Sequence, residues 1–370
     1  MAVGAADRVH IPVSADFQVV RYQRAERDAV FAFLRAAYTP QDAERLIRQW
    51  DWKYDANPFN REPEPYILLL KENTRIVGMT GGVPLRVCID GTVHWVSHTC
   101  DWVVHPDYRD RRIARRLMER HRADRSLRFS WQNELSHERS RVHPGTGYLR
   151  LTPLVKPIDL GRLVKLVTGS AALGGISGAV AGLAHAVARP LRRSTAAPGI
   201  TVAPLDTFDT RLDTLWQRVH RDYRVIVVRD RAYLSWRFSQ RPDAQYTVFA
   251  AMRDCDVSGY LVVRRAESAG ERWGYLVDFL VEGRALALFS LLVQHAVQWL
   301  RDAGVTAVAC TVVMPPYRGA LYRHGFCPYP WQRRGYLRTN LGSPDPAVQA
   351  FEDPREWFLT MGDGDLETAF

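Results

Sequence analysis

The chain has 370 residues, of which 46% are hydrophobic and 11% aromatic, and it carries a formal net charge of +10. This length and composition predict two packed domains and exclude bulk disorder. The positive charge favours an anionic partner, such as a polyphosphate cofactor, nucleic acid or an anionic membrane surface.

The first half predicts helices followed by antiparallel strands. Residues 17–23 are expected to form a strand, and 24–37 and 40–53 to form helices. YILLLKE, RIVGMTGGVPLRVCI and TVHWVSHTCDWVV then read as strands, the last two joined by the tight-turn signal Asp90-Gly91. Residues 110–126 place apolar side chains at helical spacing among arginines, and LRFSWQN reads as a further strand.

The second half predicts the same order of elements. TVFAAMRD, VSGYLVVRRA and WGYLVDFLV read as strands, and the apolar run that follows reads as a helix ending at Gly304, a C-cap residue. VTAVACTVV is expected to be a strand and YRGALYRHG a short helix. Polar residues near 338–342 and the stretch 355–361 are expected to close the sheet.

Short matches between the two halves indicate an internal duplication. WKYDANP (52–58) and WRFSQRP (236–242) share tryptophan, a basic residue, an aromatic residue and proline at the same spacing. Asp101 in CDWVV corresponds to Asp278 in VDFLV, and two further matches, Gly78 with Gly259 and Gly147 with Gly325, keep the same order along the chain. We therefore predict a duplicated domain with small changes in the loops.

The duplication predicts three segments. These are a first domain at 1–163, a Gly/Ala-rich linker helix at 164–200 and a second domain at 201–370. Residues 166–188 have no formally charged residue, but glycine and alanine insert weakly into a membrane. We expect a linker helix or loop there, with weak contact to a membrane surface as the alternative.

The cysteines and the N-terminus indicate the compartment. The five cysteines show neither a metal-binding spacing nor the even number of a disulfide framework. The N-terminal stretch has no apolar core of signal-peptide length. We expect no metal site and a reducing, cytoplasmic compartment.

A resemblance to a known family appears in the stretch from Cys100 to Tyr148. The strand CDWVVHP, the helix YRDRRIARRLMER, the strand FSWQNE and the later GTGY are similar to the GNAT acyltransferase superfamily. In that family, backbone N–H groups of the loop and of the helix N-terminus bind the pyrophosphate of acetyl-CoA or another acyl-CoA. The resemblance implies an α+β fold of two tandem GNAT-like domains, each a mixed, mainly antiparallel sheet flanked by helices.

The resemblance also implies which residues bind the acyl-CoA. Arg109 and Ala114 take the first and last positions of the family's loop pattern, whereas Asp110 and Arg112 stand where glycine is common. The alternative is an ordinary basic face of an amphipathic helix. Backbone N–H groups near Val103–His105 would bind the oxyanion. The full set implied for the cofactor is Val103, Val104, His105, Arg109, Asp110, Arg111, Arg112, Ile113, Ala114 and Asn133.

Three residues are implied for the chemistry. Asp101 or Glu134 would accept the proton of the amine, and His143 would donate a proton to the leaving thiolate, because many family members have a tyrosine at its place. The alternatives are that Asp101 is a structural hydrogen-bonding residue, as the repeated Asp278 indicates, and that His143 is a surface histidine.

The second half lacks the basic loop, so we expect a degenerate second GNAT-like domain. The function implied is transfer of an acyl group, foremost acetyl, from acyl-CoA to a primary amine of a small molecule. An amino sugar is favoured because WKYDANP and WFLTMGD look similar to GNAT proteins of bacterial polysaccharide clusters. The alternatives are an aminoacyl-tRNA-dependent transferase of tandem GNAT fold, which would bind nucleic acid, and a non-catalytic GNAT-fold binding protein.

Overall fold

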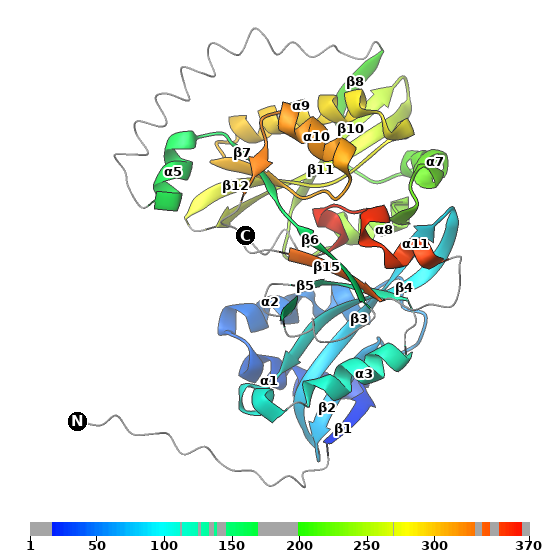
Figure 1. Cartoon of the computed structure of the whole chain (residues 1–370), viewed down its shortest axis with the longest axis vertical. Coiled ribbons are helices and arrows are strands. Elements are labelled where there is room, and N and C mark those ends of the chain that lie inside the picture. The colour runs from blue at the N-terminus through cyan, green and yellow to red at the C-terminus, as the bar shows by residue number, and fades with distance from the viewer. Residues whose placement is uncertain are drawn as a thin grey trace, which may run out of the picture. The chain divides into compact units, whose positions relative to one another are not determined.

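The computed structural model describes most of the chain as two compact units (Figure 1). The described residues are 17–111, 113–124, 127–132, 137–138, 146–168, 199–268, 270–329, 335–340 and 348–364. The first unit contains the chain up to Pro84 together with Ser97–Ser126. The second contains Leu85–Val96 and the chain from Leu127 onward.

Antiparallel strands and three helices build the first unit. In chain order the elements are β1 (Phe17–Arg21), α1 (Arg27–Ala37), α2 (Pro40–Trp50), β2 (Ile67–Glu72), β3 (Arg75–Ile89), β4 (Thr92–Val104), the 3₁₀ helix η3 (Pro106–Arg111) and α3 (Ala114–Asp124). β2 pairs antiparallel with β1 and with β3. Thr39 begins α2 because its hydroxyl accepts from the N–H of Asp42, and Pro40 takes the first helical position.

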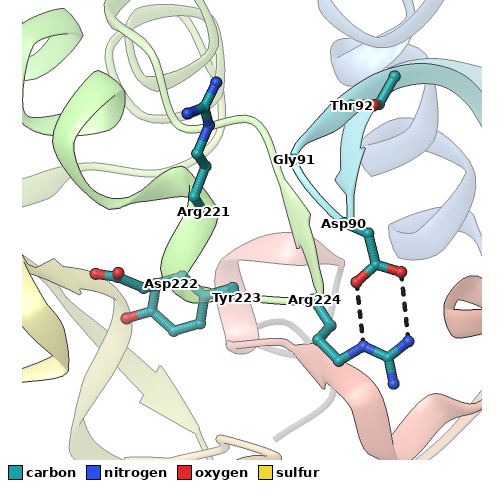
Figure 2. A pocket seen from close by; sticks show the side chains of 7 residues that line it. All are labelled: Asp90, Gly91, Thr92, Arg221, Asp222, Tyr223 and Arg224. Carbon is teal, nitrogen blue, oxygen red and sulfur yellow. Dashed lines mark hydrogen bonds and ion pairs between the residues drawn. The ribbon is translucent and has the colours of Figure 1, made fainter.

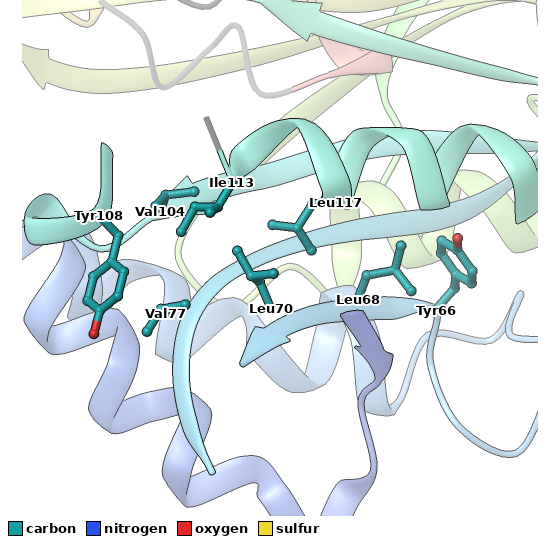
Figure 3. Packing of buried hydrophobic residues seen from close by; sticks show 8 residues of the cluster. All are labelled: Tyr66, Leu68, Leu70, Val77, Val104, Tyr108, Ile113 and Leu117. Atoms are coloured by element: carbon teal, nitrogen blue, oxygen red, sulfur yellow. The ribbon is translucent and has the colours of Figure 1, made fainter. Parts of the chain in front are cut away.

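Helix α3 packs on this sheet through its apolar face (Figure 3). Ile113 and Leu117 point toward strand residues that include Leu68 and Leu70, and all four side chains are buried. Complete burial of a leucine side chain contributes about 1.5–3 kcal/mol. Gly78 lets the helix approach closely, because a Cβ there would lie 3.2 Å from Leu117 Cδ1. The helix predicted over 110–126 is confirmed, although its α-helical part begins at Ala114.

A seven-stranded sheet forms the centre of the second unit. The elements are β5 (Arg128–Gln132), β6 (Thr146–Leu151), β7 (Leu154–Pro157), α5 (Leu160–Thr168), β8 (Ile200–Pro204), α7 (Thr210–Val219), β9 (Val225–Val227), α8 (Arg231–Leu234), β10 (Tyr246–Arg253), β11 (Asp256–Ser268), β12 (Glu271–Val281), α9 (Leu286–Asp302), β13 (Ala307–Cys310), α10 (Pro315–Arg323), β14 (Cys327–Pro328), β15 (Gly335–Asn340), α11 (Gln349–Glu352) and β16 (Trp357–Phe358). The strand order is β14-β7-β13-β12-β11-β10-β8. β12 and β13 are parallel, and the other neighbours are antiparallel.

Helices α9 and α10 lie on one face of this sheet (Figure 1). α9 connects the parallel strands β12 and β13, as such a crossover requires. The predicted end of this helix is confirmed, because Gly304 follows it with a φ of +71°, which favours glycine. The two sheets with flanking helices confirm the predicted α+β class.

Two strands pair with partners that their position in the sequence did not indicate. β7 precedes the 164–200 segment, yet it pairs with β13 and β14. β15 lies late in the chain, yet it pairs with both β5 and β6, so that Leu337 stands opposite Trp131 and Leu149. The domain boundaries expected at 163 and 200 stay a prediction.

The segment considered for membrane contact is described only in part. Of 166–188, the residues from 169 onward lie outside the described ranges. Among the helices of the described ranges, none is long and apolar enough to cross a membrane.

Candidate active site

The loop from β4 to α3 is anchored by Tyr108. Its side chain is 2% exposed, and its hydroxyl donates to the carboxylate of Glu72 on β2. Its backbone N–H donates to the carbonyl of His105 over 2.9 Å, which closes the 3₁₀ turn. Together with Ile113 and Leu117, Tyr108 therefore fixes the position at which α3 begins.

Arg109 holds the same loop from the other side. Its Nε donates to the carbonyl of Val104 over 3.2 Å, and its Nη2 donates to the carbonyl of Ala37 over 3.3 Å. Ala37 ends α1, where carbonyl groups have no partner within the helix. The Arg109 guanidinium thus connects the end of β4 to the end of α1, and it positions the loop through the backbone.

The N-terminus of α3 offers the anion-binding groups that the family uses. The first amides of an α-helix have no acceptor inside the helix, and the helix dipole favours negative charge there. Ala114 begins the helix, and Arg116 N–H closes its first turn on the carbonyl of Ile113. The backbone of Asp110 and Arg111 lies in η3, whereas Arg112 lies outside the described residues.

Three of the arginines of α3 are engaged locally. Arg115 Nε lies 2.6 Å from Glu119, Arg120 Nε lies 2.9 Å from Asp124, and Arg116 donates to the carbonyl of Phe17 over 3.0 Å. These contacts are typical of a solvated helix face, as the alternative interpretation expected. They leave the backbone at the helix N-terminus, rather than the arginine row, as the feature suited to a diphosphate.

The strand residues assigned to the cofactor have different surroundings. The N–H of His105 donates to the carbonyl of Val77 over 2.9 Å, so the sheet already uses this amide. Val104 is buried in the core under α3, and Val103 is equally buried. His105 Nδ1 accepts from the N–H of Asp107 over 3.4 Å. The oxyanion role expected for the backbone of Val103 and Val104 stays a prediction.

Asp101 lies on β4 in a compact polar cluster. Its Oδ2 accepts from the hydroxyl of Tyr54 over 2.6 Å. Lys53 Nζ lies 3.1 Å from Oδ1 and 3.0 Å from Oδ2. The Lys53 side chain is 6% exposed and that of Asp101 13%, so the carboxylate keeps some access to solvent. The φ of Asp101 is +51°, which interrupts the regular strand at this residue.

A glycine on β3 makes room for this cluster. Lys53 and Tyr54 belong to a π-helical turn, Asp51–Asp55, that extends α2. The Tyr54 hydroxyl lies 2.0 Å from the place that a Cβ would occupy at Gly81. Any larger residue at Gly81 would therefore displace the Tyr54 ring from Asp101.

Burial keeps the tyrosine of this cluster protonated. It raises the pKa of Tyr54 well above its ordinary value, and the neighbouring Asp101 carboxylate raises that pKa further. Burial, followed by the Asp101 charge, also raises the pKa of Tyr38. The Tyr54 hydroxyl is consequently a hydrogen-bond donor to Asp101 at neutral pH.

The corresponding aspartate of the second unit is enclosed. Asp278 lies on β12 and is 1% exposed. It accepts from Arg229 Nη2 over 3.0 Å, from the Tyr260 hydroxyl over 2.7 Å and from the Thr360 hydroxyl over 2.6 Å. The sequence match between Asp101 and Asp278 therefore corresponds to similar chemistry, but only the first aspartate is accessible.

A pocket of 450 Å³ in the second unit has mixed charge (Figure 2). Arg224 binds Asp90 there through two hydrogen bonds of 3.1 and 3.3 Å. Arg221 and Asp222 supply one further charge of each sign, so the lining has no excess positive charge for a phosphate. The other lining residues are Gly91, Thr92 and Tyr223.

Several predicted site residues lie outside the described ranges. These are Arg112, Asn133, Glu134 and His143, and their roles stay predictions. Conversely, the sequence did not identify Lys53 and Tyr54 as partners of Asp101. The signal available for them was the repeated WKYDANP stretch, which contains both residues.

The comparisons with known proteins agree with this geometry. A family model described as an acetyltransferase (GNAT) domain matches residues 18–127. A GCN5-related N-acetyltransferase from Anabaena variabilis has 10% identity and a TM-score of 0.57, and the alignment covers 87% of this chain and 72% of that one. No curated protein matches the sequence.

Two further solved structures have the same fold. The N-myristoyltransferase of Saccharomyces cerevisiae with bound myristoyl-CoA has 11% identity and a TM-score of 0.57, over 91% of this chain and 81% of that one. A probable N-acyltransferase from Enterococcus faecalis has 12% identity and a TM-score of 0.55, over 88% and 72% of the two chains.

The family-model match indicates the class of this domain: an N-acyltransferase that uses acyl-CoA as co-substrate. Residues 18–127 match the GNAT acetyltransferase domain, and the fold of the chain is similar to that of the solved N-acetyltransferase and N-myristoyltransferase.

Proposed function

We propose that this protein transfers an acyl group, foremost acetyl, from acyl-CoA to the primary amine of a small molecule. An amino sugar of polysaccharide metabolism is the favoured acceptor. The observation that carries the proposal is the position of Asp101 on β4, three residues before Val104, where the strand leads into the donor loop. One strand thus brings a carboxylate close to the family's acyl-CoA site.

The proposed reaction is direct transfer. Asp101 accepts a proton from the acceptor's amine, with Glu134 as the sequence-based alternative, and the nitrogen then attacks the thioester carbonyl. A C–N bond forms and the C–S bond breaks. The oxyanion is stabilised by backbone N–H groups of β4, and the thiolate leaves with a proton from His143 or water. The products are the N-acylated amine and CoA.

Isothermal calorimetry with acetyl-CoA and longer acyl-CoAs tests the donor. Binding is expected for the wild type, together with a stabilisation of about 2.7 kcal/mol at 100 times Kd. Arg109→Ala is expected to weaken binding tenfold, or about 1.4 kcal/mol, because Arg109 holds the loop. The matched control is Arg120→Ala, which removes an equal charge from the exposed far end of α3 and should bind as the wild type does.

A panel of acceptors tests the other half of the proposal. CoA release is measured with amino sugars, amino acids and polyamines at equal concentration, and amino sugars are expected to give the highest kcat/KM. Absence of acyl-CoA binding contradicts acyl transfer from CoA. Turnover that requires aminoacyl-tRNA instead supports the tRNA-dependent alternative, and acyl-CoA binding without turnover supports a binding protein.

A further inference from the structure

We propose that Lys53 and Tyr54 are positioning residues for the reaction, and that their contacts hold the Asp101 carboxylate in place to accept the proton of the acceptor's amine. This inference rests on the proposed function, in which Asp101 accepts the proton. It assigns a catalytic purpose to the contacts of the WKYDANP stretch, which would otherwise only attach the end of α2 to the sheet.

The geometry leaves one oxygen of Asp101 with spare capacity. Tyr54 donates to Oδ2, whereas Lys53 Nζ lies near both oxygens. In the described part of the chain, Oδ1 therefore has Lys53 as its donor, and a carboxylate oxygen can accept at least two hydrogen bonds. With 13% of the side chain exposed, Oδ1 can accept an additional bond from an incoming amine.

The groups around Asp101 in the described ranges differ in charge. Tyr54 and Tyr38 face the carboxylate as neutral groups, because burial raises the pKa of both. Cys100 Sγ lies 3.3 Å from the Tyr54 hydroxyl, and Asp42 contributes a more distant negative charge near Tyr38. Among the residues that the structure describes, the ammonium group of Lys53 is therefore the positive charge within hydrogen-bonding distance of Asp101.

In the second unit, the corresponding aspartate lies in a cluster that is enclosed by protein. Asp278 is held by the guanidinium of Arg229 and by two hydroxyl groups, and it is 1% exposed. Phe238 replaces Tyr54 in the repeat, so its ring has no hydroxyl to donate. The duplication has thus produced one enclosed aspartate, Asp278, and one partly exposed aspartate, Asp101, which has different partners.

The Lys53–Asp101 ion pair is also expected to add little to the stability of the fold. Desolvation of a buried ion pair offsets most of its Coulomb attraction, so apolar residues of similar volume often stabilise a fold equally well. Lys53 is 5% exposed, which means that its ammonium group has lost most of its water. A requirement for a fixed orientation of the Asp101 carboxylate accounts for this arrangement.

The test observes the Asp101 carboxyl group directly. The full-length chain is labelled with carboxyl-¹³C aspartate, Asp101→Asn assigns the signal, and all spectra are recorded at one pH. The signal is expected to move in Lys53→Met and in Tyr54→Phe, because each variant removes a donor to the carboxylate. Lys53→Arg keeps a charged donor and should leave the signal close to that of the wild type. Tyr54→Phe serves as the second variant should Lys53→Met not fold.

The same variants are then assayed for turnover. In Lys53→Met and Tyr54→Phe, kcat with the amine is expected to fall about tenfold or more, equivalent to about 1.4 kcal/mol, with the KM for acyl-CoA unchanged, and Lys53→Arg should recover part of the loss. An unchanged NMR signal in Lys53→Met and Tyr54→Phe overturns the inference, as does a moved signal with an unchanged kcat. Because the NMR measurement needs no substrate, a wild type without amine turnover refutes the proposed function separately.

Discussion

Arg229 Nη2 donates to Asp363 Oδ2 over 2.6 Å, and neither side chain is exposed to solvent. The same nitrogen donates to Asp278 on β12 over 3.0 Å. The N–H of Thr360 also donates to Asp363, over 2.9 Å. One buried guanidinium therefore attaches the segment after β16 to the middle of the second unit's sheet.

Loss of the Arg229 guanidinium should strongly destabilise the fold. Arg229→Met leaves Asp278 and Asp363 buried without their cation, so the free energy of unfolding should fall by about 3–5 kcal/mol. The control is Arg224→Met, whose exposed guanidinium pairs with Asp90 and Glu356 and should contribute at most about 1 kcal/mol. Urea unfolding curves measure both variants, and equal losses would contradict the distinction.

The close approach of Tyr54 to Gly81 supplies a second prediction for stability. Gly81→Ala should destabilise the fold by about 1–3 kcal/mol, because the new methyl group would overlap the Tyr54 hydroxyl and ring. Gly319→Ala is the control: Gly319 lies inside α10, and a Cβ there would meet nothing closer than 4.0 Å. Its replacement should stabilise the helix by about 0.5–1 kcal/mol. Thermal unfolding should therefore shift in opposite directions.

The packing of α3 against the sheet supplies a third prediction for stability. Leu117→Ala removes a side chain that is 0% exposed, and the resulting cavity should lower the free energy of unfolding by about 3–5 kcal/mol. The exposed neighbour Glu119, which pairs with Arg115, provides the control Glu119→Ala, for which a change within about 0.5 kcal/mol is expected. Because the proposed phosphate-binding site lies at the N-terminus of α3, calorimetry of Leu117→Ala should also show weaker acyl-CoA binding. Unchanged affinity and stability would refute this packing.

Cysteine reactivity supplies a prediction for pH. Burial raises the pKa of Cys310 from 9.0 to about 12, so its thiol stays protonated and unreactive at pH 8. Because the folded value is the higher one, the stability linked to this group is complete below pH 9 and is lost as the pH rises through 12. Iodoacetamide at pH 8 should label the exposed Cys255 and Cys327 but not Cys310. Mass spectrometry of the labelled peptides would contradict this if Cys310 reacts as fast as Cys255.

Local patterns in the sequence were sufficient for the elements and for part of the site. Helical spacing predicted α3, and Gly304 correctly marked the end of α9. The matched pair Asp101 and Asp278 is found on strands β4 and β12, each in a polar cluster. These features depend on periodicity and turn chemistry within a few residues, which a single sequence displays directly.

The partners of those residues were decided by the tertiary structure. Nothing local indicates that β15 joins β5 and β6, or that Tyr54 reaches Asp101 across the space left by Gly81. Strand pairing and side-chain contacts between distant segments depend on how whole elements pack. The sequence by itself thus determined the class of fold and the strand that carries the carboxylate. Packing decided which neighbours set the charge and the accessibility of that carboxylate.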